Sequence, residues 1–334
     1  MGYKVGIVGA TGLVGTTFLK VLEERDFPID ELYLFASARS AGKEIEYRGK
    51  VYIIEELTEN SFDRDMDYAL FSAGGSISEK YSPIAARNGV VVIDNSSAFR
   101  MDEDVPLVVP EVNPVSAMKH NNIIANPNCS TIQAVVPLKI IDEKWSIKRV
   151  VYSTYQAVSG SGLAGIRDLE EGIEGIPPKN YPHPIAYNCL PHIDIFMENG
   201  NTREEEKMIG ETRKILEKPN LPISATCVRV PVKHGHSISV NLDLEREFEI
   251  EDIKKALADA PGVILMDDVF NNIYPMPISV EGKDEVFVGR VRRDESLANG
   301  LNLWIVADNI RKGAATNTVQ IAELLIKQRD PASS

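Results

Sequence analysis

Short apolar runs alternate with amphipathic stretches along the first 145 residues of the chain. The runs have the continuous hydrophobicity of strands that are buried on both faces, and the stretches between them space their apolar residues as helices do. This alternation predicts a parallel sheet with helices on both faces, an α/β arrangement. The predicted strands are 5–8, 32–36, 51–54, 68–72, 90–93 and 123–125, and the predicted helices are 13–22 and 83–88.

After about residue 145 the runs become rich in β-branched residues and no longer alternate strictly with helices. This mixture predicts a second domain of the α+β type. Segment 176–191 carries five prolines and is predicted to be a long ordered loop. Segment 316–328 is predicted to be an amphipathic helix, and the sequence alone does not decide which of the two domains it packs on. Predicted strands are 149–156, 225–232, 237–244 and 286–291, and predicted helices are 163–173, 203–216 and 251–258.

A glycine-rich turn connects the first predicted strand to the first predicted helix. Its sequence is Gly9-Ala10-Thr11-Gly12-Leu13-Val14-Gly15, a G-x-x-G-x-x-G relative of the dinucleotide-binding fingerprint. Glycines there let the backbone turn tightly and approach a pyrophosphate, which binds at the helix N-terminus. The strand–turn–helix context favours a dinucleotide site over a simple tight turn.

The end of the second predicted strand indicates which dinucleotide binds. An NAD site usually carries a carboxylate there for the ribose 2′-hydroxyl. This chain has Ser37, Arg39 and Ser40 instead, and an arginine between two hydroxyls suits a 2′-phosphate. The segment therefore favours NADP. The alternative is that Arg39 is an ordinary solvent-exposed arginine of a loop.

Cys129 follows an apolar run and precedes a helical pattern over 131–141. Asn128 or Ser130 can cap that helix, which places the thiol at a helix N-terminus. The free N–H groups and the helix dipole favour the thiolate there and make the sulfur a better nucleophile. The alternative is an inert buried cysteine.

Further candidate groups lie near predicted strand ends. Gln156 ends a strand and precedes a turn that contains Ser159 and Gly160, while Arg229 ends one strand and His236 begins the next. A histidine there can serve as a general acid or base. Three other residues complete this set of candidates: Arg100, in a loop after a strand of the first domain, and Glu204 and Lys207, three apart on one predicted helix face.

Two alternatives accompany these assignments. His234 and His236 are potential metal ligands, but no third ligand is suitably spaced, so no metal site is predicted. Glu204 and Lys207 have the sequence of an ordinary solvated helix surface. A single histidine is more often structural than catalytic, so the functional interpretation of His236 depends on Cys129.

The composition of the chain indicates which partners and which cellular compartment to expect. The chain has 334 residues, 49 of them acidic and 36 basic, for a net charge of −13, which argues against nucleic-acid and anionic-membrane partners. Its three cysteines have neither disulfide nor metal-site spacing, which favours a reducing cytoplasm. No signal peptide or membrane-spanning segment is predicted.

Taken together, the motifs resemble NADP-dependent aspartate-β-semialdehyde dehydrogenases over essentially the full length of the chain. The segments that carry the resemblance are 9–15, 37–40, 96–100, 127–131, 156–160, 229–236 and 317–320. The resemblance implies a Rossmann-type NADP-binding domain, 1–128 plus 314–334, and an α+β catalytic and dimerisation domain, 129–313. It also implies a homodimer that reduces L-aspartyl-4-phosphate with NADPH, in biosynthesis of lysine, threonine, methionine and isoleucine.

The resemblance also implies individual roles. Cys129 would form an acyl-thioester, His236 would be the acid–base residue, and Gln156 would orient the substrate. Arg229 would bind the substrate α-carboxylate and Glu204 its ammonium group. Phosphate would be bound by Arg100, Lys207 and Asn128, and the nicotinamide would lie near Ser159, Gly160 and Asn317.

Two other functions are compatible with the same motifs. An N-acetyl-glutamyl-phosphate reductase uses the same cofactor, thiol and histidine, but its acetylated amine needs no carboxylate partner, so Glu204 favours the free-amine substrate. A non-catalytic NADP-binding relative would be indicated by loss of Cys129 or His236, and both residues are present.

Overall fold

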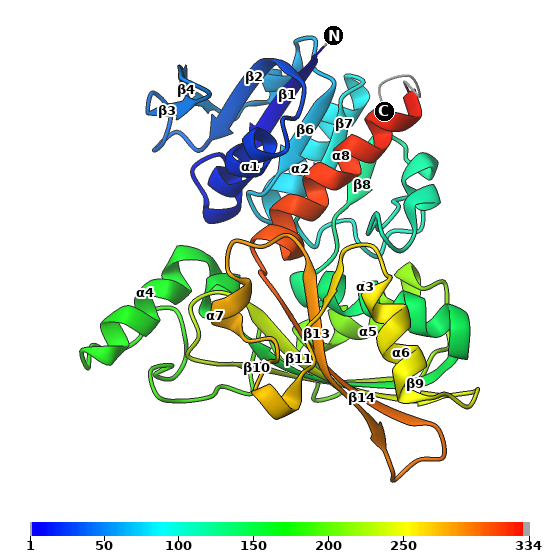
Figure 1. The fold of residues 1–334 in the computed structure, drawn as a ribbon. Coiled ribbons are helices and arrows are strands. Elements are labelled where there is room, and N and C mark those ends of the chain that lie inside the picture. The colour runs from blue at the N-terminus through cyan, green and yellow to red at the C-terminus, as the bar shows by residue number, and fades with distance from the viewer. Residues whose placement is uncertain (1, 330–334) are drawn as a thin grey trace. The chain divides into compact units, whose positions relative to one another are not determined.

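The computed structural model describes residues 2–329, so residue 1 and residues 330–334 of the predicted first domain lie outside the described residues. The chain forms two compact units. Unit 1 contains Met1–Pro127 and Ala314–Ser334, and unit 2 contains Asn128–Gly313 (Figure 1).

Unit 1 is built on a six-stranded sheet in which every neighbouring pair is parallel. The prediction of a parallel sheet is confirmed. In spatial order the strands are β5 (Glu55–Glu56), β2 (Ile29–Ala36), β1 (Tyr3–Val8), β6 (Tyr68–Phe71), β7 (Val91–Asp94) and β8 (Ile123–Ala125). The helices are α1 (Leu13–Glu24), α2 (Gly75–Arg87) and α8 (Thr316–Arg329).

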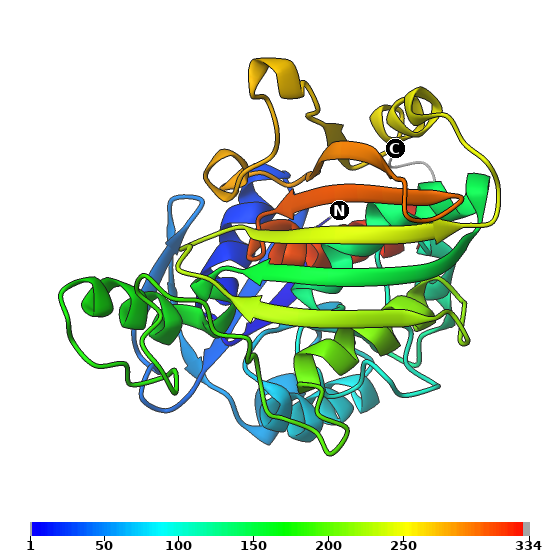
Figure 2. The same cartoon turned by 90° about the horizontal axis from the view of Figure 1, so that it is seen from below.

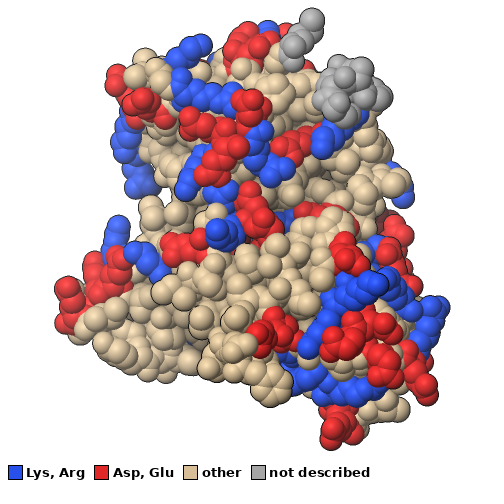
Figure 3. Space-filling view, viewed as in Figure 1, with Lys and Arg blue, Asp and Glu red and all other residues tan. Residues whose placement is uncertain are grey.

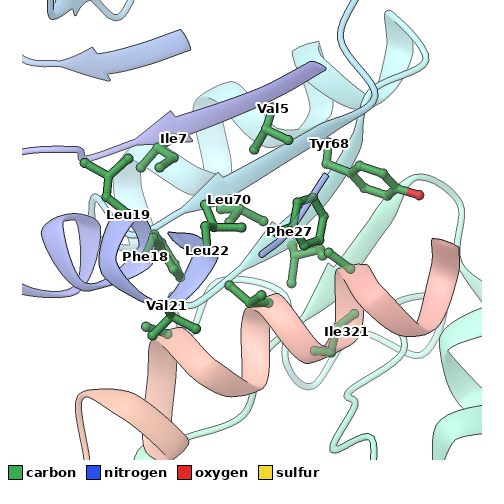
Figure 4. Close-up of a cluster of buried hydrophobic side chains, with 14 of the residues drawn as sticks. Val5, Ile7, Phe18, Leu19, Val21, Leu22, Phe27, Tyr68, Leu70 and Ile321 are labelled. Atoms are coloured by element: carbon green, nitrogen blue, oxygen red, sulfur yellow. The ribbon is translucent and has the colours of Figure 1, made fainter. Parts of the chain in front are cut away.

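The central strands β6 and β7 of this sheet are buried on both faces, which explains why they are nearly continuous apolar runs. Alternate residues of one strand join different core clusters: Ile7 packs on the side of α1 and α8, whereas Val8 packs on the side of α2. Figure 4 shows side chains of the first cluster, which come from the strands, from α1 (Phe18) and from α8 (Ile321). The last helix of the chain therefore completes the core of unit 1.

Unit 2 contains a mixed six-stranded sheet. The strands are, in spatial order, β10 (Ile223–Arg229), β9 (Ile147–Gln156), β11 (His236–Leu244), β14 (Gly300–Ala307), β13 (Val286–Asp294) and β12 (Val263–Leu265). β11 is antiparallel to both neighbours, whereas β10 is parallel to β9. The longer helices are α3 (Cys129–Trp145), α4 (Gly162–Ile173), α5 (Arg203–Ile215) and α6 (Ile250–Ala258).

The two faces of this second sheet differ in how deeply their side chains are buried. Along β9, Val150, Tyr152 and Thr154 are fully buried, and the Tyr152 hydroxyl lies 3.2 Å from Thr212 on α5. The intervening side chains, including Ser153 and Tyr155, are partly or largely exposed. Figure 2 views this sheet from its second face, which no described helix crosses. The predicted fold class, a Rossmann-type domain with a second α+β domain, is confirmed.

Some local predictions were wrong. Segment 51–54 was expected in the parallel sheet, but β4 (Lys50–Ile53) pairs antiparallel with β3 (Glu44–Tyr47) in a separate hairpin. Val51 and Ile53 are exposed there, so their hydrophobicity does not indicate burial. Segment 225–232 was expected to be one strand, but β10 ends at Arg229. Pro231, which lacks an N–H donor, follows it.

Other elements were missed or shortened by sequence reasoning. Helix 83–88 is the end of the longer α2, whose first half is too polar to show a helical pattern and which contains Pro83. Strands β3, β5, β12 and β14 were not predicted. Among the described residues, no helix has the length and apolar character needed to cross a membrane.

Candidate active site

The glycine turn of unit 1 leaves no room for side chains at two positions. Gly9 has φ +91°, and a methyl group there would lie 2.4 Å from the Ser72 carbonyl oxygen. A methyl group on Gly15 would lie 2.1 Å from the Gly9 carbonyl oxygen. Gly12 is the N-cap of α1, and no side chain caps that helix. The turn therefore presents bare backbone at a helix N-terminus, the geometry that binds a pyrophosphate.

The turn lies against the end of β2. The N–H groups of Gly9 and Ala10 donate to the Phe35 carbonyl at 2.9 and 3.1 Å. Ser37 and Arg39 follow β2 and are exposed, and Ser40 closes a turn through a 2.8 Å bond from its N–H to the Ser37 carbonyl. The residues predicted to bind the 2′-phosphate therefore follow β2, the strand whose end contacts the glycine turn.

Arg100 and Asn317 meet in an amide network at the ends of β7 and β8. Asn317 Nδ2 donates to Asn126 Oδ1 at 2.7 Å, and Asn126 Nδ2 donates to Asn95 Oδ1 at 3.0 Å. Arg100 donates to the main-chain oxygens of Asn126 at 2.9 Å and Asn95 at 2.8 Å. Sequence reasoning missed Asn95 and Asn126, although each directly follows a buried strand.

Cys129 is the first residue of α3 in unit 2, as predicted, and it is partly exposed. Asn128, not Ser130, is the N-cap: its Oδ1 accepts from the N–H groups of Ser130 at 3.0 Å and Thr131 at 3.3 Å. Gly313 lies so close to Cys129 that a methyl group on this glycine would be 2.8 Å from Cys129 Cβ. Sequence reasoning missed this glycine.

Glu204 joins several predicted residues around Asn128. Its Oε1 accepts from Asn128 Nδ2 at 2.8 Å and from Gln156 Nε2 at 3.0 Å, and its Oε2 lies 3.2 Å from Lys207 Nζ. Burial by itself would raise the pKa of Glu204, but Lys207 and the two amide donors lower it below its ordinary value. Lys207 also pairs with Asp194 at 2.8 Å. These two residues are therefore not an ordinary solvated surface.

His236 and Arg229 are buried next to the turn that follows β9. Arg229 Nη1 donates to the Ala157 carbonyl at 2.8 Å, and a methyl group on Gly160 would lie 2.8 Å from the same nitrogen. The Ala157 N–H donates to His236 Nδ1 at 2.9 Å. Arg229 Nε and His236 Nε2 are buried without a hydrogen-bond partner among the described residues. Buried, unpaired polar atoms of this kind are typical of a ligand site.

The contact to Ala157 determines the tautomer of His236. Because a backbone N–H can only donate, Nδ1 must keep its lone pair, and the proton of the neutral ring lies on Nε2. Burial and, second, Arg229 hold the pKa of His236 well below its ordinary value of 6.5. His236 is therefore a neutral ring that offers a proton from Nε2.

The remaining predicted residue of this unit is Ser159, which contacts a residue that was not predicted. Its hydroxyl lies 3.0 Å from Asn309 Nδ2, and Asn309 Oδ1 also accepts from the Gly235 N–H at 2.9 Å. Asn309 therefore ties the turn after β9 to the turn before β11. Within residues 2–329, no three His, Cys, Asp or Glu side chains are grouped as a metal site would require.

The predicted site residues thus form one set in each unit, and comparisons with known proteins identify both units. Residues 4–120 match the family model described as semialdehyde dehydrogenase, NAD binding domain, and residues 138–312 match the dimerisation domain of the same enzymes. The aspartate-semialdehyde dehydrogenase of Aquifex aeolicus is 60% identical, over 98% of this chain and 99% of that protein. This chain belongs to the aspartate-semialdehyde dehydrogenases. The resemblance in the sequence is confirmed.

Other relatives and solved structures agree with this family. The Bacillus subtilis aspartate-semialdehyde dehydrogenase is 49% identical, with 98% of each chain covered. The crystal structure of Vibrio cholerae aspartate-semialdehyde dehydrogenase II superposes with a TM-score of 0.94 at 49% identity, covering 99% of each chain. A Candida albicans aspartate-semialdehyde dehydrogenase, solved with NADP, gives a TM-score of 0.76 at 26% identity, covering 98% of this chain and 99% of that one.

The buried neutral His236 should affect the pH dependence of folding. The unfolded chain takes up a proton on this ring below about pH 6.5, whereas the folded chain resists it, so stability should fall as the pH falls through that value. One such proton contributes up to about 1.4 kcal/mol per pH unit. In His236→Asn, the slope of the unfolding free energy between about pH 5 and pH 6.5 should be shallower, as measured by urea titration.

The exposed His183→Asn is the matched control for this measurement. An equal change of slope in both variants, or none in His236→Asn, would contradict the assignment of His236 as a buried neutral ring.

Proposed function

We propose that the chain catalyses the reversible reaction L-aspartyl-4-phosphate + NADPH + H⁺ → L-aspartate 4-semialdehyde + NADP⁺ + phosphate. The observation that carries the proposal is Cys129 at the first position of α3, with Asn128 as its cap. The Cys129 thiolate attacks the acyl phosphate carbon, and phosphate leaves. Hydride would then add to the carbonyl carbon of the thioester, and the carbon–sulfur bond breaks, which releases the aldehyde and restores the thiolate. Covalent catalysis of this kind divides one difficult displacement into two easier steps. The reaction belongs to biosynthesis of the aspartate-derived amino acids.

NADP(H) would bind to unit 1 and supply the hydride. The glycine turn 9–15, in which a Cβ on Gly9 or Gly15 would clash with the backbone, fits the pyrophosphate, and Ser37, Arg39 and Ser40 fit the 2′-phosphate. Ser159, Gly160 and Asn317 are proposed to lie near the nicotinamide. Unit 1 would be the NADP-binding domain, and unit 2 the catalytic and dimerisation domain.

The remaining roles follow from charge and burial. Arg229, with a buried unpaired Nε, would bind the α-carboxylate. Glu204, with a lowered pKa, would bind the substrate ammonium, and Gln156, bonded to it, would orient the reacting carbonyl. Phosphate would be bound by Arg100, Lys207 and Asn128. An aspartate substrate with a free amine suits this carboxylate better than an N-acetylated one does.

His236 would act as a proton donor. The Ala157 contact keeps the proton of the neutral ring on Nε2, so this proton is available to the carbonyl oxygen that becomes negative when the thiolate or the hydride adds. A donor already oriented toward the developing charge stabilises the tetrahedral oxyanion without reorganisation. The backbone N–H of Cys129 is proposed as a second donor to that oxygen.

One assay tests this proposal. Purified protein should reduce NADP⁺ with aspartate semialdehyde and phosphate, and it should do so poorly with the N-acetyl-glutamate analogue. Cys129→Ala should abolish turnover but keep NADPH binding nearly unchanged, because the thiol is needed only for chemistry. Cys189→Ala, which removes an exposed cysteine, is the control and should retain activity. Substantial turnover by Cys129→Ala would eliminate the thioester mechanism.

Cofactor preference provides a second test. Arg39→Ala should weaken NADP binding about ten- to a hundredfold, since a charged hydrogen bond is worth roughly 1.5–3 kcal/mol. Binding of NAD should change little, because NAD has no 2′-phosphate. Arg87→Ala is the control, because it removes the same charge from an exposed arginine at the end of α2. Equal use of both cofactors by the unchanged protein, measured by initial rates, would refute the role of Arg39.

We also propose a homodimer formed through unit 2, in the cytoplasm. The second face of its sheet carries partly exposed side chains, and exposed apolar residues continue in the segment before and within α7 (Pro277–Val280), including Phe270 at 96% exposure. Figure 3 shows a broad uncharged area over α7, whereas charged side chains gather around α6. Exposed apolar side chains that gather on one segment are typical of an interaction site.

An arginine in the middle of that sheet face should dissociate the dimer. Ser239 is partly exposed and pairs in register with Ser153 and Trp304 of the neighbouring strands. Ser239→Arg should give a monomer by light scattering, because the guanidinium would be buried without a partner. Asn88→Arg, at an exposed position of unit 1, is the control and should stay dimeric. A dimeric Ser239→Arg would place the interface elsewhere.

A further inference from the structure

Glu211 is a buried carboxylate that the proposed chemistry does not use. It lies on α5, seven residues after Glu204, and is 1% exposed. Residues at this spacing share one helix face. Both glutamates therefore lie on the buried side of α5, although that helix looks highly charged in sequence.

The two glutamates hold the same residue, Asn128. Glu211 Oε2 accepts from the Asn128 backbone N–H at 2.6 Å, and Glu204 Oε1 accepts from the Asn128 side-chain amide at 2.8 Å. Asn128 Oδ1 in turn caps the first turn of α3. The residue that precedes Cys129 is thus fixed at its main chain and at its side chain by one helix.

The hydrogen bond from the Asn128 N–H lies outside the ladder of α3. An N-cap residue contributes its carbonyl to the helix but not its N–H, and Pro127 before it has no N–H to donate. Asn128 is 6% exposed, so its N–H needs an acceptor from the protein. Glu211 provides that acceptor.

We propose that Glu211 is a positioning residue for Cys129, an inference that rests on the proposed thioester function. By accepting the Asn128 N–H, it fixes the peptide that leads into α3 and thereby the direction of the helix N-terminus at the thiol. Loss of the acceptor frees that peptide, and a misplacement of about 1 Å in a catalytic group costs on the order of a hundredfold in rate.

The neighbouring Glu205 provides a matched control. It is also buried on α5, at 8% exposure, but it accepts from the N–H groups of Thr202 and Cys227 at 2.6 and 3.0 Å. Neither residue belongs to α3. A variant of Glu205 therefore disturbs a buried carboxylate of the same helix without touching the peptide before Cys129.

Four variants separate hydrogen bonding, charge and stability. Glu211→Gln removes the charge and keeps an acceptor, whereas Glu211→Met has a similar shape, no charge and no acceptor. Glu211→Asp keeps the charge, but its side chain is shorter by one methylene, so the carboxylate lies farther from the Asn128 N–H. This variant remains informative if Glu211→Met fails to fold. Glu205→Met reports on general destabilisation.

Two readouts are measured for each variant. The first is kcat and KM for aspartate semialdehyde. The second is the pH profile of Cys129 alkylation by iodoacetamide in a Cys189→Ser background, followed by peptide mass spectrometry. Burial raises the pKa of the Cys227 thiol, so this third cysteine should react slowly.

Glu211→Gln should keep kcat within about threefold. Glu211→Met and Glu211→Asp should lose about ten- to a hundredfold in kcat with a smaller change in KM. The alkylation profile of Glu211→Met should lie at higher pH than that of Glu211→Gln, because a displaced helix N-terminus stabilises the thiolate less. Glu205→Met should lower the melting temperature but keep kcat and the alkylation profile near those of the parent.

Equal kcat and equal alkylation profiles for the Gln and Met variants would overturn the positioning role. The same losses in Glu205→Met would also overturn it, because they would assign the effect to stability. Alkylation reports on Cys129 without turnover, so it tests Glu211 even if Cys129→Ala keeps its activity and the thioester mechanism fails.

Discussion

The proposed chemistry of unit 2 depends on one interaction, the cap of α3 at Asn128. A nucleophile at a helix N-terminus needs the first turn to be fixed, and here Asn128 fixes it through Ser130 and Thr131. Asn128 is held in turn by two carboxylates of α5, which packs against β10 through the Glu205 contact to Cys227. A local backbone requirement at one cysteine therefore extends through a second helix into the sheet.

Sequence reasoning found the parts of the site whose chemistry is local. The glycine turn is recognisable because Gly9 and Gly15 exclude a Cβ, and Cys129 is recognisable because a capping residue precedes it. It missed Asn126, Asn309 and Glu211, whose partners are distant in sequence. Only the fold brings those partners together, so no short pattern contains them.

The fold shows the same division between local and distant determinants. Strands buried on both faces, such as β6, are continuous apolar runs and were predicted nearly to the residue. The exposed hairpin strand β4 has a similar apolar pattern, and pairing with β3 rather than burial determines its position. β14 was missed although it is central to its sheet and follows β13 after the short connection 295–299. Only its pairing with β11 joins residues that are far apart in sequence.

The buried face of α5 carried a signal that sequence reasoning did not use fully. Glu204, Met208, Glu211 and Ile215 follow one another at intervals of four, three and four, which is the spacing of the apolar stripe of a helix. Carboxylates on such a stripe are costly to bury unless donors meet them. The energetic conflict itself therefore indicates a polar site beneath the helix, and the donors are supplied by Asn128 and Gln156.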